Sequence, residues 1–336
     1  ITEQYDWKHY KDEVLQNKNR ENRYQFNVFT MLYFRPTPKL NISLAGALNQ
    51  VTYRLTDRFT ANGDQSGERK FPRIISPRIG LNYTPGTNWA IYASAGHGYS
   101  MPSPEETLLP EGDVNPGIRP EQGMQYEAGT RLNLFGGRLG LDGTVYWIEL
   151  NNLLVTKRIT EDIFTGMNAG KTRHQGFELL VQSRMFRYSQ FPGQLGSSFS
   201  YARSLNRFID FTDNDNTYDG NKLPGIPDHT LNLLFSWDPF STLSLVTDLL
   251  YTGDQYLNDS NSLDYSGYFL GNLKVTAQIQ IRKSGMFIFY AGINNFTHTR
   301  YASMLVVNAL GFDNSEPRYY YPGLPRQFYG GIQFRF

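Results

Sequence analysis

The end of the chain alternates between apolar and polar residues with a period of two. In residues 326–336, one face of an extended strand would carry Phe328, Gly330, Ile332, Phe334 and Phe336, and the other face mostly polar side chains. A soluble sandwich seldom carries an apolar face up to the terminal carboxylate, where water would meet it. The closing strand of an outer-membrane barrel shows one face to lipid and the other to a wet lumen. The pattern therefore indicates a transmembrane β-barrel.

The same alternation recurs along the chain, at 40–48, 89–95, 139–147 and 269–281. In the last segment the apolar face includes Leu273, Val275 and Ile279, and the opposite face continues through Lys274 and Gln278 to Arg282. A packed interior does not accept such a polar face, because buried charges and amides need partners, whereas a water-filled or plugged lumen does. The alternative is a two-sheet sandwich with this face in solvent. Strands of ten or more residues favour the barrel, because soluble strands average about five or six.

The connections are of two kinds that alternate strictly. Tight turns rich in proline and glycine fall at 35–39, 84–87, 135–137, 186–193, 237–241 and 282–285. Long polar stretches fall at roughly 55–74, 100–121, 156–170, 206–227, 254–264 and 297–323. Short periplasmic turns and long extracellular loops are typical of bacterial outer-membrane barrels. We therefore predict an all-β, antiparallel up-and-down barrel with about fourteen strands in this chain, the segment 325–336 pairing with 286–296.

The amino-acid composition further narrows the class of protein to which this chain can belong. The 336 residues contain no apolar run near the roughly 18–20 residues of a membrane-spanning helix. The 23 tyrosines and 23 phenylalanines suit the aromatic belts of a barrel. A net charge of +1 gives no reason to expect a nucleic-acid partner, and the absence of cysteine excludes disulfides and thiolate metal sites. No change of composition marks a second domain, so residues 1–336 are assigned to one barrel portion.

Catalytic and metal chemistry find little support. The five histidines show neither HxxxH nor HExxH spacing, and no serine stands on a nucleophile elbow, so we predict no metal site, no cofactor and no enzyme activity. The acidic loop at 210–220 lacks the bidentate glutamate of a calcium loop; a solvated loop is favoured there, with calcium as the alternative.

Binding is the remaining function, and cations and aromatics gather in the proposed loops. The candidate ligand-binding residues are Tyr99, Arg119, Arg158, Arg173, His174, Arg318, Tyr319 and Tyr320. Guanidinium groups grip carboxylate oxygens in a bidentate manner, so an anionic ferric chelate would suit them, with tyrosines closing around it. A haem propionate or a sugar would use the same groups. The tyrosine run fits an interfacial girdle equally well, and His174 fits a hydrogen-bonded wall histidine.

Four segments, in order, resemble the C-terminal part of a TonB-dependent outer-membrane receptor. The first joins residues 93–104 to Asn115-Pro-Gly-Ile-Arg-Pro-Glu121 and Tyr126-Glu-Ala-Gly129. The second is Asn168-Ala-Gly-Lys-Thr-Arg-His-Gln-Gly-Phe-Glu178, and the third is residues 223–232. The fourth joins residues 292–301 to the ending at 322–336, with His298 where the family usually has an acidic residue.

This resemblance implies a plugged barrel of about 22 strands, of which this chain would supply the later fourteen. The plug and roughly eight earlier strands would then precede Ile1. It implies a place in the outer membrane lipid of a Gram-negative cell, coupling to TonB through the missing plug, and import of a ferric siderophore. Residues 171–176 are most similar to receptors of the ferric-citrate kind.

Several alternatives stay open from the sequence. Haem, cobalamin or oligosaccharide uptake would fit within the same family. A passive porin, an outer-membrane enzyme barrel or a soluble all-β adhesin would lie outside it. Glu127 and Glu178 lie in the predicted lumen-facing register, where carboxylates are expected to pair with Arg or Lys.

Overall fold

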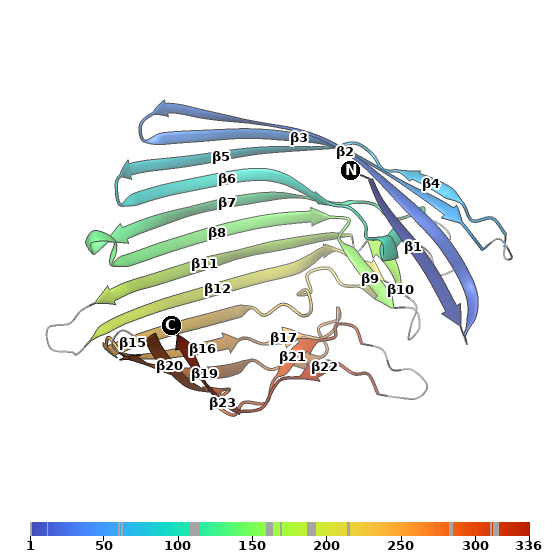
Figure 1. Cartoon of the computed structure of the whole chain (residues 1–336). Coiled ribbons are helices and arrows are strands. Elements are labelled where there is room, and N and C mark those ends of the chain that lie inside the picture. Colours follow the sequence, from blue (N-terminus) through green and yellow to red (C-terminus); the bar gives the residue numbers. More distant parts are fainter. Residues whose placement is uncertain are drawn as a thin grey trace.

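The computed structural model describes residues 2–11, 13–59, 61, 63–107, 115–158, 164–168, 170–186, 193–213, 216–281, 285–309, 311 and 316–336. Its main feature is one antiparallel sheet in which fourteen strands lie side by side in chain order (Figure 1). These strands are β1 (Thr2–Lys11), β2 (Val14–Thr37), β3 (Leu40–Asp57), β5 (Ile74–Gly86), β6 (Trp89–Ser100), β7 (Glu121–Leu134), β8 (Leu139–Asn151), β11 (Lys171–Phe186), β12 (Gln194–Asp210), β15 (His229–Phe240), β16 (Leu243–Thr252), β19 (Tyr268–Ile281), β20 (Gly285–Asn294) and β23 (Gln327–Arg335). The predicted strand count and chain-order topology are confirmed.

The remaining elements are short and lie in the connections. The strand β4 (Gly67–Lys70) pairs with β3, and the chain also forms the helix α1 (Pro104–Thr107) and the 3₁₀ turn η2 (Phe135–Gly137). Four further pairs of short strands form hairpins: β9 (Leu154–Arg158) with β10 (Phe164–Asn168), β13 (Thr212–Asp213) with β14 (Asn216–Thr217), β17 (Gln255–Tyr256) with β18 (Asp264–Tyr265), and β21 (Ala302–Leu305) with β22 (Tyr320–Pro322). In the described part of the chain, no helix has both the length and the apolar character needed to cross a lipid bilayer. The short hairpins were not predicted, because strands of two to five residues carry no readable period.

Apart from the short connection between β1 and β2, the tight turns gather at one end of the sheet and the long loops at the other (Figure 1). The turn between β7 and β8 shows why glycine is needed there. Phe135, Gly136 and Gly137 have φ angles of 53°, 68° and 83°, a left-handed run that glycine adopts without steric cost. By the usual arrangement of such barrels, the turn end is periplasmic and the loop end extracellular.

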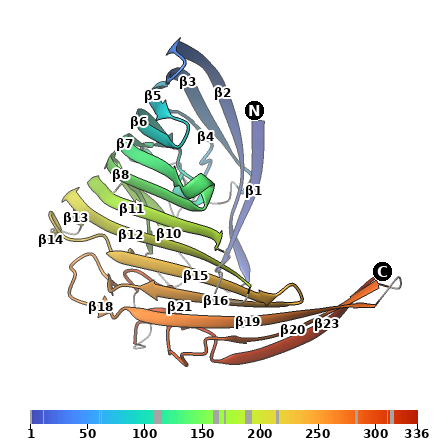
Figure 2. The same cartoon turned by 90° about the vertical axis from the view of Figure 1, so that its left-hand side faces the viewer.

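The sheet curves into an open trough whose outer strands are β1 and β23 (Figure 2). A buried cluster identifies its concave side, because Val51 and Tyr53 of β3 join Ile118 and the partly buried Leu154. Four strands separate β3 from the chain at Leu154, so these residues can meet only across the inside of the curve. Val51 and Tyr53 share their face of β3 with Asn41, Ser43 and Asn49. The concave face is therefore the polar one.

The predicted register of β19 is confirmed. Lys274 lies 5.4 Å from the ring of Tyr290 on the concave side, which places Val275 on the convex, lipid-facing side. Arg282 lies outside the described residues. The terminal strand β23 pairs with β20 from Met286↔Arg335 to Asn294↔Gln327, as predicted.

Tyrosines on the concave face lie over glycines of the neighbouring strand. A side chain at Gly129 would collide with the ring of Tyr92, and one at Gly176 with the ring of Tyr146. These are the glycines of two motifs singled out in the sequence, and their role is to admit an aromatic ring against the backbone of the next strand.

Replacing Val275 with arginine should cost about 2–4 kcal/mol in unfolding free energy, because the charge would lie on the lipid face near mid-strand. The same change at Thr276, on the concave face, should be mild. Equilibrium unfolding in lipid vesicles would measure both. Equal costs at the two positions would contradict the assignment of the faces.

Candidate functional site

The concave wall is lined by hydrogen-bonded polar side chains. Arg131 of β7 donates to Asp142 of β8, with Nε 2.7 Å from Oδ2. Further along the sheet, Asn232 and Asn272 donate to the carboxylate of Asp248 at 2.8 and 3.3 Å. Because these carboxylates already have partners within the wall, they do not neutralise the arginines of the loops.

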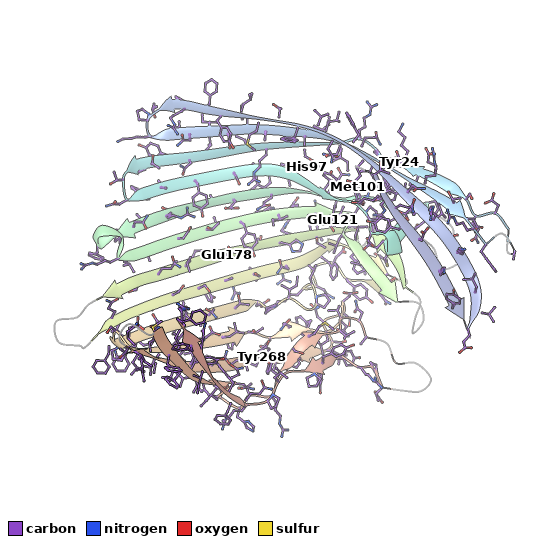
Figure 3. All side chains as sticks on the ribbon, viewed as in Figure 1. Tyr24, His97, Met101, Glu121, Glu178 and Tyr268 are labelled. Carbon is purple, nitrogen blue, oxygen red and sulfur yellow. The ribbon has the colours of Figure 1, made fainter. Side chains whose placement is uncertain are left out.

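A recess of about 530 Å³ opens in the concave wall between β7 and β12. Three of its residues can carry a charge between about pH 5 and 8, namely Glu127, His174 and Glu178. Figure 3 shows Glu178 about midway along the wall, with Glu121 and Met101 closer to the loop end. The other residues that line the recess are Gln125, Thr144, Tyr146, Ile148, Leu150, Ser204, Asn206 and Ile226.

The carboxylates make this recess acidic. Among the described residues, neither Glu127 nor Glu178 has an ion pair with a cation, and Glu127 accepts a hydrogen bond from the neutral amide of Gln125 at 3.4 Å. The salt bridges expected for these two glutamates are therefore not formed among the described residues. A lumen surface of this kind attracts a cationic group rather than an anionic chelate.

His174 is held within the wall by both ring nitrogens. Its Nδ1 donates to Oδ1 of Asn206 at 2.9 Å, and its Nε2 lies 3.1 Å from Oγ1 of Thr172. With its amide as assigned, Asn206 accepts this bond and fixes one tautomer of the ring. His174 faces the lumen, and its two bonded ring nitrogens fit the alternative of a hydrogen-bonded wall histidine, whereas contact with a ligand stays a prediction.

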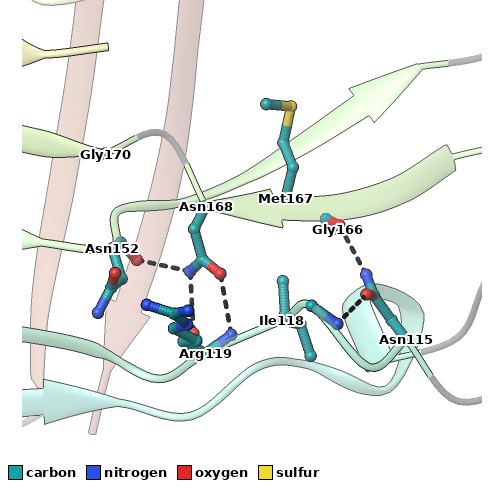
Figure 4. A pocket seen from close by; sticks show the side chains of 9 residues that line it. Asn115, Ile118, Arg119, Asn152, Gly166, Met167, Asn168 and Gly170 are labelled. Carbon is teal, nitrogen blue, oxygen red and sulfur yellow. Dashed lines mark hydrogen bonds between the residues drawn. The ribbon is translucent and has the colours of Figure 1, made fainter. Parts of the chain in front are cut away.

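A second recess, of about 350 Å³, lies among the loops above the wall (Figure 4). Arg119 lines it with an exposed side chain, and its backbone is clamped by Asn168. Oδ1 of Asn168 accepts from the amide of Arg119 at 2.9 Å, and Nδ2 donates to the carbonyls of Arg119 and Asn152 at 2.9 and 2.8 Å. Asn115 similarly donates to the carbonyl of Gly166 at 3.0 Å. Two motifs far apart in the sequence thus hold each other in place.

Asparagine side chains join other loops in the same way. Asn261 accepts from the amide of Lys222 and donates to its carbonyl, at 2.8 and 2.9 Å. Asn308 donates to Asp259 at 2.8 Å, and burial raises the pKa of that carboxyl although this hydrogen bond opposes the shift. Sequence reasoning assigned no role to these residues. Their only signal was the frequency of asparagine in loops, where its amide can mimic a backbone peptide.

Replacing Asn168 with alanine should loosen the recess around Arg119, because the change removes three hydrogen bonds and leaves polar backbone groups without them. We expect local destabilisation of about 2–4 kcal/mol, at roughly 1 kcal/mol per bond. Hydrogen exchange of the amide of Arg119 would measure it. The control is Asn258→Ala, in a loop further along the chain. If the amide of Arg119 were equally protected from exchange in the two variants, Asn168 would not hold the backbone of Arg119 in place.

Two of the three candidate tyrosines, Tyr319 and Tyr320, lie at the extracellular hairpin β21–β22. Tyr320 is 58% exposed, and its ring centroid lies 6.1 Å from that of Tyr265 in the neighbouring loop. Tyr268 continues the aromatic group, 5.3 Å from Tyr301. Tyr319 is half-buried, and Arg318 is exposed just before β22. Arg318 and Tyr320 are therefore available to a molecule outside the chain.

Two other candidates face away from the lumen. Arg173 hydrogen-bonds to Glu149 at 2.8 Å and lies 4.6 Å from the ring of Trp147, on the opposite face of β11 from His174. Tyr99 shares the convex face of β6 with Ile91. Arg173 is therefore not among the arginines that face the lumen, because neighbouring strand residues project to opposite faces, and ligand contact by Arg173 or Tyr99 stays a prediction. The side chain of Arg158 lies outside the described residues.

The described residues offer few groups that could bind a metal ion. Among the described residues, no group of three histidines or carboxylates could hold a metal ion. In the acidic loop, Asp219 accepts a hydrogen bond from the amide of Phe211 at 2.9 Å, and Asp215 lies outside the described residues.

Comparison with known families gives one match over most of the chain. The family model described as TonB dependent receptor-like, beta-barrel, matches residues 2–296. The metal-pseudopaline receptor CntO of Pseudomonas aeruginosa is 26% identical over 175 residues, which are 51% of this chain and 22% of the receptor. The ferrichrome outer membrane transporter and phage receptor of Escherichia coli is 24% identical over 235 residues, 68% of this chain and 28% of the transporter. The chain therefore spans well under half of these relatives.

Solved structures give the same fold. The ferric citrate transporter FecA in its unliganded form superposes with a TM-score of 0.74 at 16% identity, covering 97% of this chain and 47% of that one. The siderophore receptor PiuA of Acinetobacter baumannii gives a TM-score of 0.73 at 15% identity, covering 96% and 44%.

Proposed function

The chain belongs to the TonB-dependent receptor family, whose barrels are receptors and transporters of the outer membrane rather than enzymes, and we propose that it forms part of the wall of an active importer of ferric siderophores or related iron chelates. Uptake of haem, cobalamin or an oligosaccharide by the same family is the second candidate. No feature of the described residues favours it over an iron chelate.

The observation that carries this proposal is the pair of exposed arginines on separate extracellular loops. Arg119 lines the recess among the loops, and Arg318 precedes the exposed Tyr320. Neither has a carboxylate within ion-pair distance among the described residues. Unpaired guanidinium groups attract anions and bind carboxylate oxygens in a bidentate manner. An anionic ferric chelate has this chemistry.

The acidic recess supports the proposal that import is active, which means that it is coupled to an energy source. Glu127 and Glu178 face the lumen, and neither forms an ion pair with a cation among the described residues. Unpaired carboxylates in a confined lumen are costly unless positive groups lie against them. We assign those positive groups to a plug domain inside the barrel, through which TonB would act.

A binding assay tests the choice of ligand. The full-length protein in detergent would be titrated with ferric citrate, a neutral ferric hydroxamate, haem and cobalamin, at low and high salt. We expect the ferric chelates to bind, and the anionic one to lose affinity as salt rises, because salt screens exposed charges. Binding of cobalamin alone, or of no ferric chelate, would overturn the proposed ligand class.

A further inference from the structure

Four cations lie together on the convex wall, at the loop end of β11 and β12. They are Lys171, Arg173, Arg203 and Arg207, and we refer to them as the outer cationic patch. The pairings Arg173↔Arg207 and Phe177↔Arg203 place them on the face opposite His174, which lines the lumen recess. Lys171 shares this face by strand alternation. None of these side chains can take part in a lumen site.

The positive charge of the patch is only partly balanced. Glu149 serves both Arg173 at 2.8 Å and Lys171 at 3.4 Å. The two exposed arginines of β12 have no carboxylate partner among the described residues, since Arg203 contacts the ring of His229 and Arg207 donates to the carbonyl of Gly220.

The pairing of Arg173 with Arg207 is unfavourable in isolation. The two residues are direct cross-strand partners on one face, and like charges in such positions destabilise a sheet. Their juxtaposition is explained if an anion lies between them. The patch is thus suited to an anionic group that approaches from outside the barrel.

The position of the patch along the strands identifies the source of that anion. On the turn side of Lys171, Arg173 and Arg207, the convex face carries Trp147, Phe177 and Tyr201, and Phe177 lies level with Arg203. Aromatic rings mark the boundary between the apolar layer and the head groups of a membrane. The cations therefore lie at head-group level on the extracellular side, with lipid chains alongside the apolar face below them.

We propose that the outer cationic patch binds the phosphate of an outer-leaflet lipid head group. Arg173 and Arg207 would hold the phosphate oxygens, because planar guanidinium groups match phosphate in a bidentate manner. Clusters of Lys and Arg beside an apolar membrane surface recognise anionic lipid head groups for the same reason. The acyl chains would cover Phe177 and its apolar neighbours, which a free phosphate would leave exposed.

The test uses the intact protein purified in detergent, with native mass spectrometry to measure bound lipid. The probes are diphosphoryl lipid A, lipid A with both phosphates removed, and inorganic phosphate. The variant is Arg173→Gln with Arg207→Gln, which removes two charges but keeps long side chains. The matched control is Arg20→Gln with Arg54→Gln, two arginines on the same outer face of the β1–β4 region, each paired with its own carboxylate.

We expect diphosphoryl lipid A to bind at least about tenfold more tightly than the dephosphorylated lipid, and the variant to lose about 30-fold or more of that affinity, with the control unchanged. Equal affinity in variant and control would overturn the proposal. So would equal binding of the two lipids, or inorganic phosphate bound as tightly as lipid A. If the double variant fails to show the gel mobility of a folded barrel, Arg207→Gln alone is compared with Arg54→Gln, and an unchanged affinity there overturns the proposal.

Discussion

Replacing Arg119 and Arg318 together with alanine should weaken binding of ferric citrate by about 100-fold or more. Both side chains are exposed on extracellular loops and have no ion pair among the described residues. A charge-assisted hydrogen bond contributes about 1.5–3 kcal/mol, and about 1.4 kcal/mol corresponds to a factor of ten in affinity. Titration of the purified full-length protein would measure the loss.

The matched control for this experiment is Arg20→Ala with Arg54→Ala. These arginines lie on the convex face and pair with Asp6 and Glu68, so the net charge changes equally while the loop sites stay intact. The gel mobility of the folded barrel should be the same in both variants. Unchanged affinity for ferric citrate in the Arg119 and Arg318 variant would refute the anionic-chelate proposal, but would leave membership of the transporter family untouched.

Replacing Glu127 and Glu178 together with glutamine should reduce energised uptake by about 100-fold while chelate binding from outside stays near normal. Both carboxylates line the lumen recess. If cations of a plug lie against them, removing one side of such buried pairs costs about 3–5 kcal/mol, because the other charges are left uncompensated. Uptake of radiolabelled ferric citrate by cells would measure the effect.

The control is Asp6→Asn with Glu68→Gln, which removes two exposed carboxylates from the convex side. This control should transport normally. Normal uptake by the Glu127 and Glu178 variant would exclude an essential contact between these carboxylates and a plug. Loss of both binding and uptake would instead indicate that the carboxylates shape the wall itself.

The long strands could be predicted because the pattern that specifies them, the alternation of apolar and polar residues, is contained in each strand's own sequence. A strand that separates lipid from a wet lumen must alternate at every residue, so Val275 and Lys274 reveal their faces in the sequence without knowledge of any neighbour. The same rule applied to β11 separates Arg173 from His174. Arg173 and His174 are adjacent in the sequence but face opposite sides of the wall, and Arg173 bonds to Glu149 on the convex side.

The sequence by itself determined the strand count, the register of the wall, the turn and loop ends, and the family. Each depends on period-two alternation or on short motifs, which are read along the chain. Only the tertiary structure decided which loops meet, because the clamp between Asn168 and Arg119 joins residues 49 positions apart. It also decided which charges are neutralised. Asp142 pairs with Arg131 between the neighbouring strands β7 and β8, whereas Glu178 and Arg207 have no ion pair among the described residues. Charge pairing depends on distance in space rather than on order in the chain.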